Sequence, residues 1–178
     1  MTATDTGTWT VMDHVIPGTP LADADPATVT LDELTAPLRA IAAAPAPADD
    51  LPHLADWLHQ RLIDDNLTDL PPGETAAPLP ERKRALDVLD ELATDTRPSL
   101  CHGDPSPWNV LRGSDGRWLL IDPRGLHGEV EYDAAVMAIK ISAAVPSVPD
   151  MAVVVADAAE LDCDRVRAWT TIARAARV

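Results

Sequence analysis

The chain has 178 residues, enough for one domain with a hydrophobic core, and its formal net charge of −15 argues against nucleic acids and anionic membranes as partners. Its two cysteines, Cys101 and Cys163, are too few and too far apart for a disulfide framework or a zinc site. No apolar run approaches the ~18 residues of a membrane span and no signal peptide is recognisable, so we expect a cytoplasmic protein.

The first predicted element is a short strand near the beginning of the chain. Apolar residues at positions 9–12 and 15–16 indicate this strand, and the sequence Pro-Gly-Thr-Pro-Leu at 17–21 is expected to end it in a turn. On the sequence alone, an edge strand followed by a turn is a sufficient interpretation.

Helical periodicity dominates the rest of the chain. In residues 30–44 apolar side chains recur at helical spacing, Thr30 can cap the first turn, and Glu33 stands three positions further on. Residues 81–92 are amphipathic, and Lys83, between two arginines, is interpreted as part of a solvated basic face. Asp162 is expected to cap the last helix. The fold class is therefore α+β and mostly helical, with further helices over 54–63, 132–144, 149–161 and 162–178.

A β-hairpin is predicted between two of these helical regions. The short apolar runs 109–111 and 118–121 flank the turn-forming sequence Gly-Ser-Asp-Gly at 113–116. In such a hairpin Asn109 falls almost opposite Leu120, and Asp122 sits at the same open end, one or two cross-strand spacings of ~5 Å away. The loop that precedes the hairpin, stiffened by two prolines, is expected to bring Asp104 to the same place.

These side chains suit phosphoryl transfer. The reaction needs a carboxylate to receive the proton of the attacking hydroxyl, and hard oxygen ligands for nucleotide-bound magnesium. Asp104 can be the first, and Asn109 and Asp122 the second. Each of them alone is an ordinary loop residue, and only their spacing together favours a site. We interpret His102 as a packed imidazole that braces the loop, and Trp108 as core or as the wall of a cleft.

The hairpin, the loop before it and the acidic segment after it resemble those of the aminoglycoside phosphotransferase family, in particular its streptomycin 6-phosphotransferases and hydroxyurea phosphotransferases. The resemblance is strong over residues 98–140 and weaker elsewhere. Those enzymes share an Ile-Asp-Pro-Lys-Gly-Leu-like segment, followed by glycine, an acidic residue and Tyr-Asp. In this chain Arg124 replaces the lysine. The segments that carry the resemblance are His102-Gly103-Asp104, Asn109-Val110-Leu111, Trp118 to Leu126 and Gly128 to Asp133.

The resemblance implies a role for each position that matches. It implies Asp104 as catalytic base in a catalytic group that includes His102, and it implies Mg²⁺ and ATP as cofactors, with Asn109 and Asp122 as magnesium ligands. The early strand would be a hinge that contacts adenine through Asp13, His14 and Val15. The side chains expected to face a small, cationic substrate are Glu129, Glu131, Asp133 and Trp108.

Other interpretations of the acidic tail stay open at this point. Asp133 can cap the next helix and tie down the catalytic loop. Glu129 and Glu131 can be solvated loop carboxylates with no direct role in binding. For Glu129 and Glu131 the sequence favours solvated loop carboxylates over contact with a substrate.

The implied domain organisation is a hinge-like segment at 1–24 and a kinase-like C-terminal lobe, catalytic and substrate-binding, at 25–178. Kinases of this class grip the nucleotide phosphates with a glycine-rich loop and a lysine on a strand. The sequence contains neither ahead of the hinge-like segment, so we expect the N-lobe to be absent. A lobe that exposes the covered face of a kinase has reason to associate with a second copy or with a separate N-lobe chain.

Three functions are compatible with these residues. The first is a phosphotransferase that moves the ATP γ-phosphoryl group to a hydroxyl of a small molecule. The second is an inactive lobe that acts as a binding or scaffold module. The third is a metal-dependent hydrolase that uses His102, Asp104 and Asp122 as ligands, which would leave Asn109 without a role. A serine hydrolase is disfavoured because the residues around Ser106 do not form a nucleophile elbow.

Overall fold

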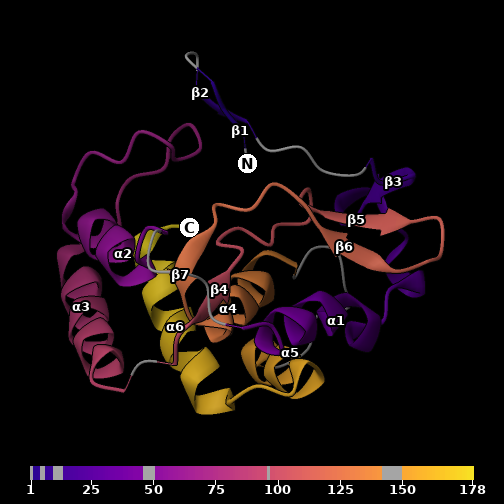
Figure 1. Cartoon of the computed structure of the whole chain (residues 1–178). Coiled ribbons are helices and arrows are strands. Elements are labelled where there is room, and N and C mark those ends of the chain that lie inside the picture. The colour runs from indigo at the N-terminus through magenta and orange to yellow at the C-terminus, as the bar shows by residue number, and fades with distance from the viewer. Residues whose placement is uncertain (1, 5–6, 10–13, 46–50, 96, 142–149) are drawn as a thin grey trace.

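The computed structural model describes residues 2–4, 7–9, 14–45, 51–95, 97–141 and 150–178. Along the described residues, short strands and longer helices come in separate groups, with strands first, then helices, then strands and helices again (Figure 1), which confirms the expected α+β class with a mostly helical content. The helices are α1 (Leu31–Ala42), α2 (Leu54–Ile63), α3 (Leu79–Ala93), α4 (Val130–Lys140), α5 (Met151–Ala159) and α6 (Cys163–Ala176). The strands are β1 (Thr2–Thr4), β2 (Gly7–Trp9), β3 (Pro17–Pro20), β4 (Ser99–Cys101), β5 (Val110–Gly113), β6 (Trp118–Leu120) and β7 (Leu126–Gly128).

The strands form three small antiparallel sheets. β1 pairs with β2, and β4 pairs with β7. The third sheet has the order β3-β5-β6, and its β5–β6 hairpin is the one predicted from the sequence. The pairing of β4 with β7 was not predicted, because three-residue strands that meet across a long loop leave no periodic signal. It ties the start of the predicted catalytic loop, which runs over residues 102–109 between β4 and β5, to the segment just before α4.

A strand occupies residues predicted to form a turn, whereas residues 10–13 of the predicted early strand lie outside the described residues and residues 14–16 are not in a strand. The expected turn at 17–21 contains β3 itself, which pairs with β5 in a register that shifts between Pro17 and Thr19. Gly18, with φ of 71°, occupies the shift. β3 is an edge strand, where a proline without an N–H costs no ladder bond. The expectation was wrong because proline and glycine were taken as turn signals at a place where the sheet edge accommodates both.

The predicted helices are confirmed, with ends that differ by a few residues. Thr30 caps α1 by accepting a hydrogen bond from the backbone N–H of Glu33 at 3.4 Å. Asp162 caps α6, because its carboxylate accepts from the N–H groups of Asp164 and Arg165. α4 begins two residues before its predicted start, and residues 142–144 of the prediction lie outside the described residues.

Helix α4 is the centre of the molecule. Every residue from Val130 to Ala138 is buried, as expected for a helix surrounded on all sides. It packs against α5 and α6, and α1 also contacts it. In Figure 1, α1 and α5 lie below the β3-β5-β6 sheet, while α2 and α3 stand on the opposite side of the molecule. The predicted catalytic loop is bonded to this buried helix, because Asp133 of α4 accepts hydrogen bonds from the N–H groups of His102 and Gly103.

The predicted basic face of α3 is only partly solvated. Lys83 and Arg84 are exposed, but Arg82 is buried. Its guanidinium donates to the carbonyls of Ala77 and Leu62 and pairs with Asp65. The expectation failed at Arg82 because backbone carbonyls near a helix end accept the hydrogen bonds of its buried guanidinium. No sequence pattern predicts such contacts.

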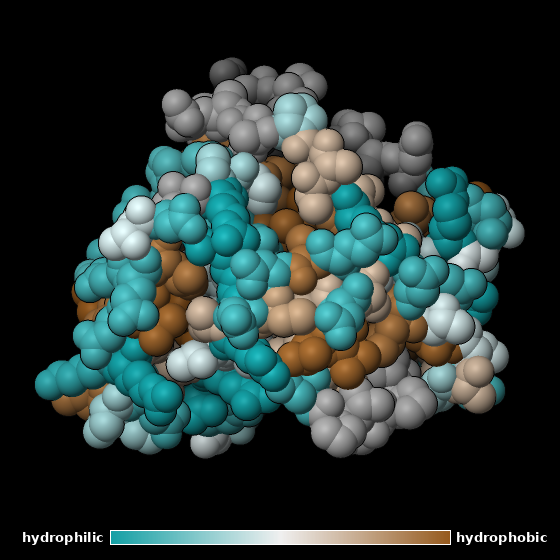
Figure 2. Space-filling view, turned by 90° about the horizontal axis from the view of Figure 1, so that it is seen from below, coloured by the Kyte–Doolittle hydropathy of each residue, from teal (hydrophilic) through white to brown (hydrophobic). Residues whose placement is uncertain are grey.

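The outer surface follows from amphipathic helices that turn their polar sides outward. Figure 2 shows hydrophilic residues over much of the face seen from below, with hydrophobic residues gathered nearer its middle. Among the described residues, no helix is both long and apolar enough to cross a membrane.

Candidate active site

The open end of the hairpin, where Asn109 and Asp122 lie, is called the mouth below. Its geometry is set by the pairing register of β5 and β6. Val110 pairs with Leu120, and the N–H of Ile121 donates to the carbonyl of Asn109 at 2.9 Å. Asn109 thus lies opposite Ile121, one residue from the predicted partner. Asp122 follows directly and is exposed, in a left-handed backbone conformation with φ of 55°. The backbones of Asn109 and Asp122 therefore lie at the same open end of the hairpin.

The catalytic loop is fastened to this mouth by the Asn109 amide. Its Nδ2 donates to the backbone carbonyl of Asp104 at 2.9 Å. The same carbonyl accepts from the N–H of Ser106, whose own carbonyl accepts from the N–H of Asn109. Within the described part of the chain, no hydrogen bond engages Asn109 Oδ1. The amide nitrogen thus holds the loop while the amide oxygen is left available to a cation.

His102 braces the loop, the role predicted for it. Its Nε2 lies 2.8 Å from the carbonyl of Ile121, and its Nδ1 accepts from the N–H of Asp104 at 3.2 Å. Burial lowers the pKa of His102, against the attraction of nearby Asp104 and Asp122. A neutral ring protonated at Nε2 satisfies both contacts. With both nitrogens engaged, His102 positions Asp104 and is not free to act as a base itself.

Asp133 holds the loop from below. Its two carboxylate oxygens accept from the backbone N–H groups of His102 at 2.7 Å and of Gly103 at 2.8 Å. Burial raises the pKa of Asp133 to about 7, although these two amides act in the opposite direction. The expectation that Asp133 ties down the loop is met. The alternative that it caps the next helix is wrong, because it lies inside the first turn of α4.

The two glutamates of the acidic tail are buried, so their interpretation as solvated carboxylates is wrong. Glu129 forms an ion pair with Arg165 and accepts from Trp169 Nε1 at 2.9 Å and from the N–H of Arg97. Burial raises the pKa of Glu131. The oxygens of Glu129 are thus occupied by groups that fasten α6 and the α3–β4 connection to the start of α4.

Two cations at the mouth were missed in the sequence. Lys140, in the last turn of α4, donates from Nζ to Asp104 Oδ1 at 2.8 Å. Arg124 places a guanidinium nitrogen 3.9 Å from Asp104 Oδ2, and its guanidinium lies 5.1 Å from the ring centroid of Trp57. Lys140 is 36 residues from Asp104, so only the tertiary fold brings them together. Arg124 was noted in the sequence only as the replacement of a family lysine.

The remaining predicted residues are only partly placed. Trp108 is 63% exposed, so it does not belong to the core. His14 and Val15 precede β3, and Asp13 lies outside the described residues. Just after β3, the N–H of Ala22 donates to the carbonyl of Pro107 at 3.1 Å. The early segment therefore runs past the catalytic loop.

The donor set at the mouth suits a hard cation with few protein ligands. Carboxylate and amide oxygens are what Mg²⁺ binds, and it keeps waters and phosphate oxygens as its other ligands. Among the described residues, no group of three or more histidines, cysteines, aspartates and glutamates is placed to hold a metal ion. The ring nitrogens of His102 are both engaged by backbone groups, which argues against His102 as a metal ligand in the hydrolase alternative.

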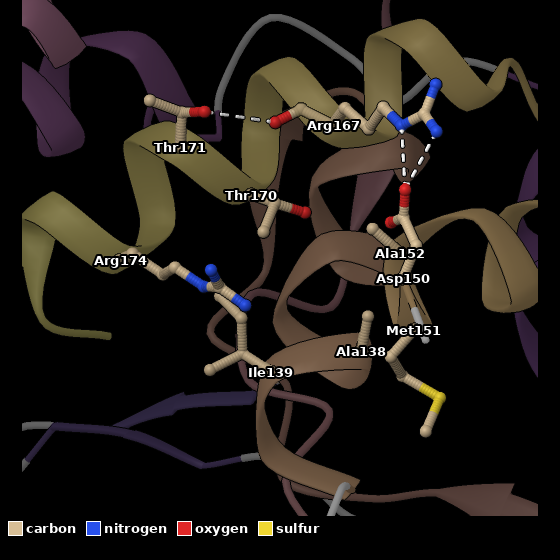
Figure 3. A pocket seen from close by; sticks show the side chains of 9 residues that line it. All are labelled: Ala138, Ile139, Asp150, Met151, Ala152, Arg167, Thr170, Thr171 and Arg174. Carbon is tan, nitrogen blue, oxygen red and sulfur yellow. Dashed lines mark hydrogen bonds and ion pairs between the residues drawn. The ribbon is translucent and has the colours of Figure 1, made fainter. Parts of the chain in front are cut away.

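A cavity of about 570 Å³ lies beside the C-terminal half of α4 (Figure 3). Ala138 and Ile139 line one side, and α5 and α6 supply the rest. Arg167 spans its edge to Asp150, with 2.7 Å between Nη2 and Oδ2. Arg174 also lines the cavity. With two arginines and one aspartate, this cavity lacks the acidic lining expected for a cationic substrate.

The chain resembles known kinases in sequence and in fold. The model of the aminoglycoside/hydroxyurea antibiotic resistance kinase family matches residues 20–177. The fold resembles the crystal structure of choline kinase LicA from Streptococcus pneumoniae, with a TM-score of 0.63 and 14% identity over 93% of this chain. LicA in complex with AMP gives a TM-score of 0.60 at 15% identity, also over 93% of this chain. The chain spans 58% and 57% of those two structures. No curated protein sequence matches it.

Proposed function

Because the chain belongs to the aminoglycoside/hydroxyurea antibiotic resistance kinase family, we propose that it moves the γ-phosphoryl group of ATP to a hydroxyl group of a small molecule. The observation that carries the proposal is the hairpin mouth. There Asn109 binds the backbone of Asp104, and Asp122 follows the strand that pairs with Asn109. One carboxylate for the proton and two oxygen side chains for a cation are the parts that this reaction needs.

In the proposed mechanism Asp104 orients the acceptor hydroxyl and receives its proton. His102 and Asp133 hold the loop that carries it, and positioning of this kind supplies much of the rate in phosphoryl transfer. Asn109 and Asp122 would hold Mg²⁺, which neutralises charge on the nucleotide phosphates. We further propose that the segment with Asp13, His14 and Val15 contacts the adenine. Trp108, exposed on the catalytic loop, is available for contact with a substrate.

The test is ATP-dependent phosphate transfer by the protein, offered an aminoglycoside, hydroxyurea and choline in separate assays. Asp104→Asn is expected to lower kcat about 1,000-fold, within the range that a general base contributes. Asp115→Asn is the matched control, because Asp115 is an exposed aspartate at the far end of the same hairpin. Equal activity in the wild type and in Asp104→Asn would refute the assignment of the base.

A second function, a binding module without catalysis, predicts a different pair of results. Calorimetric titration with Mg·ATP would then show binding, and no acceptor would be phosphorylated. The geometry favours the enzyme, because a module that only bound nucleotide would not need an aspartate whose backbone N–H, backbone carbonyl and carboxylate are each held by a separate hydrogen bond.

A further inference from the structure

Lys140 is the one lysine that reaches the catalytic loop. The chain contains two lysines, Lys83 and Lys140. Lys83 is exposed on α3, whereas Lys140 is half-buried and donates to Asp104 Oδ1 at 2.8 Å. Since α4 is the central helix, its last turn holds the Lys140 ammonium group in a fixed place beside the proposed base.

The ammonium group has more donors than its contact with Asp104 uses. A lysine carries three N–H donors, and one is directed at Oδ1. Among the described residues, Lys140 Nζ has no other hydrogen-bond or ion-pair partner. Arg124 approaches the second oxygen, Oδ2, only to 3.9 Å, which is too long for a hydrogen bond. Oδ2 thus stays open for a hydroxyl proton, while two cations flank the same carboxylate.

The reaction geometry brings a phosphoryl group to these cations. A hydroxyl that gives its proton to Asp104 Oδ2 lies about 2.6–3.2 Å from it. The phosphorus that it attacks lies a further ~3–3.5 Å away. The equatorial phosphoryl oxygens, which carry the charge of the transition state, then come within reach of a lysine on the other oxygen of the same carboxylate.

We propose that Lys140, with Arg124 beside it, binds the phosphoryl group during transfer; this inference rests on the proposed function. The hydroxyl oxygen forms a bond to the γ-phosphorus as the bond to the bridging oxygen of ATP breaks. The proton of the hydroxyl passes to Asp104 Oδ2, and ADP leaves with the electron pair of the broken bond. Lys140 stays protonated throughout and contributes charge, in the way that preorganised donors stabilise developing negative charge elsewhere.

Nuclear magnetic resonance can observe Lys140 directly, without turnover. A protein labelled with carbon-13 at lysine Cε gives two lysine signals, and a Lys83→Arg variant assigns them. The probes are Mg·AMP-PNP, a non-hydrolysable analogue with a γ-phosphate, and AMP, which lacks one. We expect Mg·AMP-PNP to shift the Lys140 signal and to leave Lys83 unmoved, and AMP to shift neither.

Two negative outcomes separate the inference from the proposed function. If calorimetry shows that Mg·AMP-PNP binds while the Lys140 signal stays in place, the role of Lys140 is refuted and the kinase assignment stands. If the analogue does not bind at all, the proposed function fails and the inference fails with it. A shift of the same size with AMP would show that Lys140 senses the nucleoside part, which also refutes the inference.

Kinetics of three variants measure the size of the effect. Lys140→Met is expected to lower kcat about 100-fold, the loss typical for removal of one donor to a developing charge, with little change in KM for ATP. Lys140→Arg keeps the charge and should recover part of the rate. Lys83→Met serves as the control and should match the wild type. A rise in KM with unchanged kcat in Lys140→Met would contradict a role in the transition state.

Discussion

The hairpin mouth and the first turn of α4 are both rich in acidic groups, yet they use them in opposite ways. At the mouth, Asp122 is exposed and Asp104 is half-buried beside two cations. At the start of α4, Glu129 and Asp133 are buried and every carboxylate oxygen has a donor. The first arrangement leaves oxygens available for ligands, whereas the second uses them up in fixing the backbone. The two regions touch where Asp133 holds the amides under the catalytic loop.

The largest expected loss of stability follows from breaking the buried ion pair between Glu129 and Arg165. Arg165→Met would leave Glu129 as a buried charge without its partner, which typically costs about 4 kcal/mol of stability. Chemical denaturation measures the loss. In the fraction that stays folded, Mg·ATP affinity should be unchanged, because Glu129 supports the scaffold and takes no part in binding.

Arg167→Met is the matched control for that experiment. Arg167 lies in the same helix, two residues further on, and pairs with Asp150 on the surface. Exposed pairs contribute little, so this variant should unfold almost like the wild type. If the two variants lost the same stability, the contacts of Glu129 would not be what holds α6 to the start of α4.

The next effect is the pH dependence that Asp133 adds to stability. Its pKa is raised to about 7 in the folded protein from the ordinary value of 3.8, so the folded state binds the proton more tightly. Between about pH 4 and pH 7 the free energy of unfolding therefore falls as the pH rises, by roughly 4 kcal/mol in all if burial acts in full. Urea denaturation at several pH values, compared with Asp133→Asn, isolates this contribution.

Asp133→Asn cannot titrate, so the difference between wild type and variant should shrink from acid to neutral pH. Two parallel curves would show that the two amide donors offset the cost of burial. They would also show that Asp133 stays ionised throughout, as an acceptor of two N–H groups.

The sequence predicted one region better than the other for a physical reason. The hairpin depends on local turn chemistry and alternation, so the placement of Asn109 and Asp122 at its open end followed from neighbours in the chain. The burial of Glu129 depends on Arg165, 36 residues away, and the charge beside Asp104 depends on Lys140 at the same separation. Contacts at that distance are set by helix packing, which a single sequence does not reveal. Helix caps such as Thr30 are local again, and they were predicted correctly.

The smallest predicted effect concerns Asn109, which is both a proposed magnesium ligand and a hydrogen-bond donor to the loop that carries Asp104. Asn109→Ala removes one oxygen proposed for Mg²⁺ and one hydrogen bond to the Asp104 carbonyl. We expect Mg·ATP affinity to fall about tenfold, or ~1.4 kcal/mol, and stability to fall by about 1 kcal/mol. Asn66→Ala, at the other asparagine of the chain and on an exposed turn, should change neither. If Asn109→Ala lost stability but kept its affinity, Asn109 would belong with the buried carboxylates as scaffold, and Asp122 would be left as the one magnesium ligand proposed at the mouth.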